Sequence, residues 1–147
     1  MKHNNGWIAV ILLLIAGVLL SACGTTASKA ASEKPALVEK IEGTELNRVT
    51  LTERAAQRLD VQTAPVREEQ VNGTQRLVIP YAAVIYDLKG ETWAYTSPAP
   101  LTFVRQPITV DFIEGDMAVL IDGPSVGTQV ATVGVAELYG ADTGVGK

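Results

Sequence analysis

The sequence contains one cysteine and one histidine, the side chains best suited to nucleophilic and acid–base chemistry near neutral pH, and the cysteine stands apart. Cys23 is the only cysteine among 147 residues, so its thiol cannot form a disulfide within the chain. His3 is the only histidine. A cysteine thiol is a better nucleophile than a hydroxyl and is a site for covalent modification. The residues around Cys23 therefore indicate what its thiol does.

The residues before Cys23 have the pattern of a secretory signal peptide. A positive start at Lys2 is followed by residues 7–20, which are apolar apart from glycine. This run is shorter than the roughly 20 residues with which a helix crosses the hydrocarbon core. Leu20-Ser-Ala-Cys23 resembles a bacterial lipobox, in which the cysteine is diacylated and the peptide bond before it is cut. Residues 1–22 are thus predicted to be a lipoprotein signal peptide, and Cys23 the lipidation site.

Lipidation would attach residues 23–147 to the extracytoplasmic side of a bacterial membrane, in the cell envelope. The alternative is an unused cysteine beside an ordinary signal-peptidase site. Cleavage also removes His3, which excludes Ser-His-Asp and Cys-His catalysis and every histidine-based metal site. Without Lys2 the chain keeps 11 basic and 16 acidic residues, so we expect no nucleic-acid partner.

Two further sets of polar residues could do chemistry, but turns explain both better. Four carboxylates lie close together in sequence, yet not at the spacing of a calcium-binding loop. They are Asp111, Glu114, Asp116 and Asp122. Ser125 lies in Gly-Pro-Ser-Val-Gly, where proline precedes the serine and no base is near. We therefore predict no catalytic residue, no metal site, no enzymatic activity, and no cofactor besides the covalent lipid on Cys23.

The aromatic side chains are the remaining candidates for function. Trp93 and Tyr95 alternate onto one face and Tyr81 and Ala83 onto another, so one of these sets must be exposed or covered by a partner. The simple interpretation is that about half of the aromatics fill the core. The functional one is a docking surface, because aromatic residues and arginine are enriched at interface centres. The candidate partner-binding residues are Trp93, Tyr95, Phe103 and Arg105.

Short strands must position these side chains. Residues 23–45 are polar and rich in small residues, which predicts a flexible tether. Thr52 is a candidate N-cap for a two-turn helix. Asn72-Gly73 predicts a tight hairpin between residues 66–71 and 74–79, because both residues of the turn accept positive φ.

More apolar runs, separated by turn residues, follow this hairpin. They cover residues 81–86, 92–96, 101–105, 108–113, 117–121 and 129–135. About eight short strands at spacings of about 8 to 12 residues predict an all-β domain. We expect a small barrel or roll-like sheet module with one short helix over residues 46–140. Residues 136–139 are expected to add one helical turn at most, and residues 141–147 to fray.

Two segments of the sequence share patterns with one protein family. Residues 50–66 form the first, and the second runs from Val78-Ile-Pro-Tyr-Ala-Ala-Val84 through Phe103-Val-Arg105 to Asp122-Gly-Pro-Ser-Val-Gly-Thr-Gln-Val130. They resemble the two parts of the membrane-proximal domain of periplasmic adaptor subunits, the membrane fusion proteins of efflux systems. The family inserts a β-barrel, a lipoyl-like domain and a helical hairpin between these parts. Here residues 67–77 alone separate them.

The resemblance implies a membrane-proximal domain in minimal form, without the long helical hairpin. It also implies an accessory, adaptor-like role in membrane transport or efflux, exerted through contacts with an inner-membrane transporter. The alternative is a ligand-binding or sensor lipoprotein that uses the same fold without a transporter. A neighbouring gene for a transporter permease or ATPase would favour the first interpretation.

Overall fold

The computed structural model describes residues 34–144. The predicted signal peptide, Cys23 and the first part of the predicted tether lie outside these residues. Within the described range, no helix has both the length and the apolar character needed to cross a bilayer.

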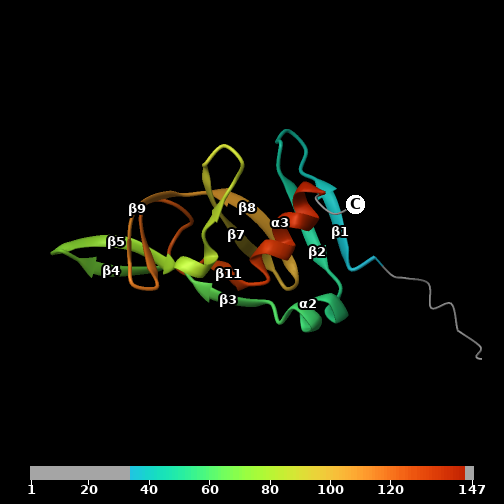
Figure 1. The fold of residues 1–147 in the computed structure, drawn as a ribbon, viewed down its shortest axis with the longest axis horizontal. Helices are drawn as coiled ribbons and strands as arrows, with labels where there is room; N and C mark the ends of the chain where they lie inside the picture. Colours follow the sequence, from blue (N-terminus) through green and yellow to red (C-terminus); the bar gives the residue numbers. More distant parts are fainter. Residues whose placement is uncertain (1–33, 145–147) are drawn as a thin grey trace, which may run out of the picture. The chain divides into compact units, whose positions relative to one another are not determined.

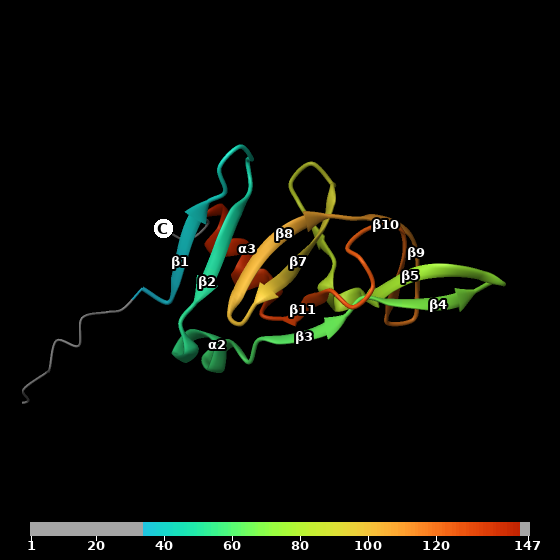
Figure 2. The same ribbon diagram turned by 180° about the vertical axis from the view of Figure 1, so that it is seen from behind.

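The described residues form an all-β fold of two antiparallel sheets, which confirms the predicted fold class (Figures 1 and 2). The larger sheet contains, in spatial order, β1 (Ala36–Lys40), β2 (Asn47–Leu51), β8 (Thr102–Pro107), β7 (Thr92–Ala99), β11 (Gln129–Val133) and β3 (Gln62–Pro65), with β6 (Ile85–Tyr86) paired to β7. The smaller sheet contains β4 (Arg67–Val71), β5 (Thr74–Pro80), β10 (Met117–Asp122) and β9 (Thr109–Glu114). Neither sheet closes into a barrel.

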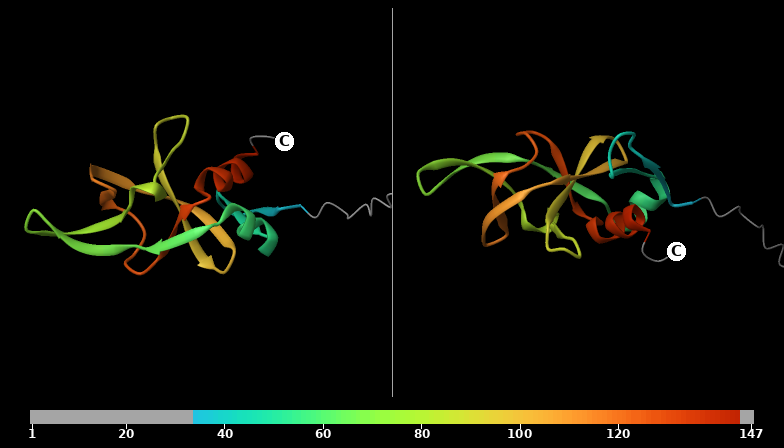
Figure 3. Two further views of the ribbon diagram at one scale, coloured as in Figure 1. Left: turned by 60° about the horizontal axis from the view of Figure 1, so that its bottom comes forward. Right: turned by 90° about the horizontal axis from the view of Figure 1, so that it is seen from above.

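Three helical segments accompany the sheets in residues 34–144. They are α2 (Glu53–Leu59), the 3₁₀ turn η1 (Tyr81–Ala83) and α3 (Val135–Thr143). Figure 3 shows α3 beside the larger sheet, while the β4–β5 hairpin extends away from that sheet.

The central strands β7 and β11 of the larger sheet are packed on both faces, where successive residues point to opposite sides. Ala94 of β7 and Val130 of β11 belong to a core shared with the smaller sheet. Their neighbours Tyr95 and Ala131 belong to a second core, which includes Leu138 of α3. Strands β7 and β11 thus separate a core shared with the smaller sheet from a core beneath α3.

Two local predictions are confirmed. Asn72 and Gly73 adopt φ of 52° and 82° and join β4 to β5 as a tight hairpin. Thr52 caps α2, where its Oγ1 accepts a hydrogen bond of 3.2 Å from the backbone N–H of Ala55. Both features depend on residues within a few positions of one another.

The predicted tether and one predicted strand need correction. Residues 36–40 of the tether form β1, which pairs with β2 along its whole length and turns Ala36 and Val38 toward the core. Residues 81–86 are not one strand, because η1 follows Pro80 and only Ile85 and Tyr86 pair with β7. The backbone N–H of Tyr81 donates instead to the carbonyl of Asp116 at 2.7 Å.

The C-terminal segment differs most from prediction. In place of a single turn and a frayed tail, α3 has nine residues and buries Leu138 and Asp142, which are four positions apart. The turn into it depends on Gly134, which has φ of 79°. A Cβ at this position would lie 2.9 Å from Cγ2 of Val61. Glycine thus allows α3 to fold back onto the sheet.

We predict that Thr52→Ala lowers the free energy of unfolding by about 1 kcal/mol, because a backbone donor of α2 loses its acceptor. Urea denaturation monitored by circular dichroism measures this change. Thr109→Ala, at an exposed position of β9, is the matched control. An equal loss in both variants would contradict the capping role.

Candidate functional site

The structure separates the four candidate partner-binding residues into two pairs. Tyr95 and Phe103 are 0% and 3% exposed and belong to the core beneath α3. Trp93 and Arg105 are half-buried. A fully buried side chain cannot meet a partner, so Tyr95 and Phe103 are corrected to core residues. Partner binding by Trp93 and Arg105 stays a prediction.

The chain's own C-terminal helix explains this division. Tyr95 of β7 lies opposite Arg105 of β8, so both side chains point to the face that α3 covers. Sequence reasoning left this face open to either a core or a partner. It is packed largely within the chain itself.

A buried carboxylate of α3 organises the polar contacts on this face. The side chain of Asp142 is 1% exposed. Its Oδ2 accepts a hydrogen bond of 2.6 Å from the hydroxyl of Tyr95. The amide Nδ2 of Asn47, on β2, donates to Asp142 Oδ1 at 2.9 Å and to the Asp142 carbonyl oxygen at 3.0 Å. Helix α3 is thereby bonded to two strands of the larger sheet.

Arg105 supplies the counter-charge from a third strand, β8. Its Nε lies 3.3 Å from Asp142 Oδ2 and is buried, yet it makes no hydrogen bond within the described residues. The contact is therefore an ion pair without an aligned donor. The guanidinium carbon also lies 4.5 Å from the ring centroid of Trp93 and 5.8 Å from that of Tyr139, within cation–π range.

Burial raises the pKa of Tyr95 above its ordinary value of 10.0, and the hydrogen bond to Asp142 raises it further. The Arg105 charge opposes this effect and does not cancel it. Tyr95 is thus a protonated donor at neutral pH. The interaction of Tyr95 with Asp142 is a hydrogen bond to a buried acceptor, which holds the two elements together.

Three half-buried side chains lie above this network and form the candidate site, the Trp93–Arg105–Tyr139 patch. Tryptophan, tyrosine and arginine are the residue types enriched in binding hot spots. Sequence reasoning identified Trp93 and Arg105 but missed Tyr139, since α3 was expected to be one turn. The apolar Leu138 and Tyr139, four and five positions after Gly134, were the available signal for a longer helix.

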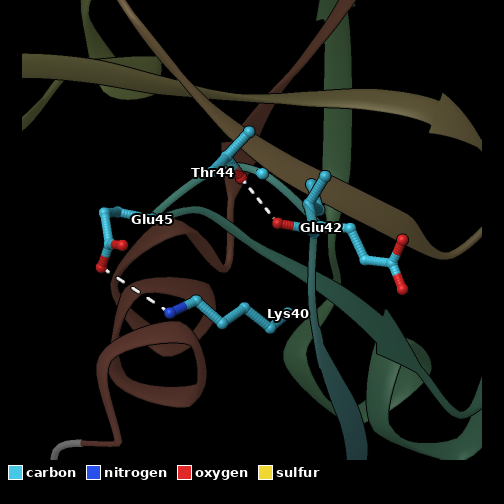
Figure 4. A pocket seen from close by; sticks show the side chains of 6 residues that line it. Lys40, Glu42, Thr44 and Glu45 are labelled. Carbon is cyan, nitrogen blue, oxygen red and sulfur yellow. Dashed lines mark hydrogen bonds and ion pairs between the residues drawn. The ribbon is translucent and has the colours of Figure 1, made fainter.

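Polar groups in the β1–β2 loop contact one another. The hollow within the β1–β2 loop is lined by residues 40–45, where Lys40 Nζ lies 3.7 Å from Glu45 Oε2 and Thr44 Oγ1 donates to the Ile41 carbonyl at 3.0 Å (Figure 4). These contacts stabilise the turn.

The four carboxylates of residues 111–122, which we attribute to turns, do not converge on one point in the described structure. Asp111 instead pairs with Arg76, at 2.6 Å between Oδ2 and the guanidinium nitrogen. Among residues 34–144, no group of three histidine, cysteine or carboxylate side chains is arranged to hold a metal ion.

We predict that Asp142→Ala lowers the free energy of unfolding by about 3 to 5 kcal/mol, because it leaves a half-buried arginine without its counter-charge and a buried hydroxyl without an acceptor. Asp111→Ala is the matched control: it also removes an aspartate from an arginine, but at a more exposed pair, and should cost about 1 kcal/mol or less. Chemical denaturation of both variants measures the difference. Equal costs would contradict the anchoring role of Asp142.

The raised pKa of Tyr95 predicts a loss of stability at alkaline pH. Unfolded Tyr95 ionises near pH 10 and the folded residue does not, so its contribution is complete below pH 10 and falls as the pH rises above it. The slope is at most about 1.4 kcal/mol per pH unit. Tyr95→Phe should flatten the stability profile above pH 10. An unchanged slope in this variant would contradict the assignment.

Comparison of the chain with protein-family models, with curated proteins and with solved structures gives no match.

Proposed function

We propose that this protein is a lipid-anchored component of the bacterial cell envelope that assists a membrane transport system, of the efflux type, through protein contacts. In this proposal Cys23 carries the lipid, and the β domain stands on the extracytoplasmic side of the membrane. The lipid anchor confines the domain to the membrane surface. This raises the effective concentration of the domain beside a membrane partner without any new contact.

One observation carries the proposal: the two adaptor-like segments fold into one unit. Thr50 of the first segment pairs with Thr102 of the second, and Ala64 pairs with Val130. Val66 lies in the same buried cluster as Ile79. Segments 50–66 and 78–135 therefore share a sheet and a core, as the resemblance requires. A detached first segment would have removed this support.

The Trp93–Arg105–Tyr139 patch is the proposed contact surface for the transporter. Beneath it Asp142 fixes Arg105, so little side-chain freedom is lost when a partner binds. The guanidinium lies near two aromatic rings, and its side chain is 16% exposed. Partly desolvated arginine and tryptophan contribute more to binding than fully exposed ones.

We predict that membranes solubilised in mild detergent yield this protein together with an inner-membrane transporter, and that Trp93→Ala reduces the recovered transporter at least about tenfold. Mass spectrometry of the captured complex identifies the partner. In the same preparation, the peptide that begins at Cys23 should carry two or three acyl chains, and Cys23→Ala should release the protein from the membrane.

Leu37→Ala is the matched control for Trp93→Ala, because Leu37 is 58% exposed on β1, away from the patch. Thermal denaturation should show both variants folded. Recovery of the transporter with Trp93→Ala at the wild-type level would contradict the contact surface. A mature chain without acyl mass on Cys23 would contradict the anchor.

A further inference from the structure

The loop between β6 and β7 presents a leucine entirely to solvent. Leu88 has a relative exposure of 101%, the highest of the large hydrophobic residues in the described range. Figures 1 and 2 show this loop projecting beyond the strands that it joins. An apolar side chain at such a tip gains nothing for folding, since it buries no surface against the rest of the domain.

Hydrogen bonds hold the backbone of the loop on both sides of Leu88. The Asp87 carboxylate Oδ1 accepts hydrogen bonds from the backbone N–H groups of Lys89 at 2.8 Å and Glu91 at 2.9 Å. The backbone N–H of Asp87 donates to the Glu91 carbonyl at 3.0 Å, and that of Gly90 donates to the Asp87 carbonyl at 3.0 Å. These four bonds fix the backbone on both sides of Leu88.

The loop is also joined to the sheet at its base. The indole N–H of Trp93 donates to Asp87 Oδ2 at 3.3 Å. Desolvation by itself would raise the pKa of Asp87, but the bonds from Glu91, Lys89 and Trp93 outweigh it and hold the pKa below its ordinary value of 3.8. Asp87 is therefore ionised at neutral pH, and its acceptor role in the loop persists there.

The residues around Leu88 suit the boundary between lipid and water. Lys89, beside the leucine, has an apolar stem that can lie along lipid while its ammonium group stays in water. Tyr86, two positions before Leu88, is 53% exposed, and tyrosine is enriched at the level of lipid head groups. An apolar tip, a long cation and a tyrosine together match a shallow membrane contact.

We propose that the β6–β7 hairpin inserts Leu88 into the lipid surface to which the protein is anchored. This inference rests on the proposed lipid at Cys23. Eleven positions separate Cys23 from Lys34, where the described domain begins, so the domain stays within about 36 to 40 Å of the anchor. The anchor thus keeps the domain that carries the tip near a bilayer.

A lipid surface fits this tip better than a protein partner. A stable protein interface buries about 1,200 Å² or more, which a single side chain on a narrow loop cannot supply. A bilayer accepts one apolar side chain without a complementary pocket. The acidic residues Asp87 and Glu91 flank Lys89, so the contact is apolar and does not need anionic lipid.

The test uses the full chain, with its lipid, in phosphatidylcholine vesicles. Leu88→Cys adds one reactive thiol, because the native cysteine is acylated, and this thiol is labelled with an environment-sensitive fluorophore. We expect a blue-shifted emission and strong quenching by lipids that carry a quencher on their acyl chains. Ile121→Cys is the matched control, at an exposed hydrophobic position in the smaller sheet.

Three results would overturn the proposal. A label at position 88 that emits as in water, or that is quenched no more than the label at 121, would show that the hairpin does not insert, even where mass spectrometry finds acyl chains on Cys23. Shielding only when a transporter is present would assign the tip to a protein. Absence of acyl mass would refute the anchor and the proposal with it. The acyl mass thus separates failure of the hairpin from failure of the proposed function.

Discussion

The buried carboxylate of Asp142 is the interaction on which the arrangement of helix and sheet depends. A carboxylate loses several kcal/mol of solvation free energy when it enters the interior. Helix α3 can therefore dock only where the sheet offers hydrogen-bond donors or a positive charge to Asp142. Tyr95 and Asn47 provide these donors from β7 and β2, and Arg105 provides a positive charge from β8. A slip of one residue in β8 would turn Arg105 to the opposite face. Docking of α3 therefore requires one register of β2, β7 and β8, and it stabilises that register.

The same constraint divides the central strand between two cores. In β7, Ala94 faces the smaller sheet and Tyr95 faces α3, and both are 0% exposed. A strand covered on both faces cannot show the alternation of buried and exposed residues that marks a half-buried strand. For this reason, the aromatic face looked available to a partner in the sequence although the chain covers it. On this face the Trp93–Arg105–Tyr139 patch stays partly exposed at the edge of α3.

Sequence reasoning succeeded where a structure is determined by neighbouring residues. The Thr52 cap and the Asn72-Gly73 hairpin need only a few consecutive positions, and the apolar runs gave most of the strands. It failed for β1 and α3, whose stability comes from distant partners. Asn47 and Asp142 are 95 positions apart and meet across the sheet. Neither residue looked functional alone, so the support beneath Trp93 and Arg105 could not be foreseen from composition or spacing.

The anchor and the hairpin tip would contribute to different properties of the protein. Two or three acyl chains bury enough methylene groups, at about 0.8 kcal/mol each, to hold the protein on the membrane without help. Leu88 adds about 2 kcal/mol when buried, which is small beside the anchor but favours one orientation of the domain by roughly thirtyfold. Trp93 is joined to the base of this hairpin through Asp87. Fixing the tip at the lipid surface would therefore also fix the height and direction of the Trp93–Arg105–Tyr139 patch, so that a membrane partner meets it in a defined geometry.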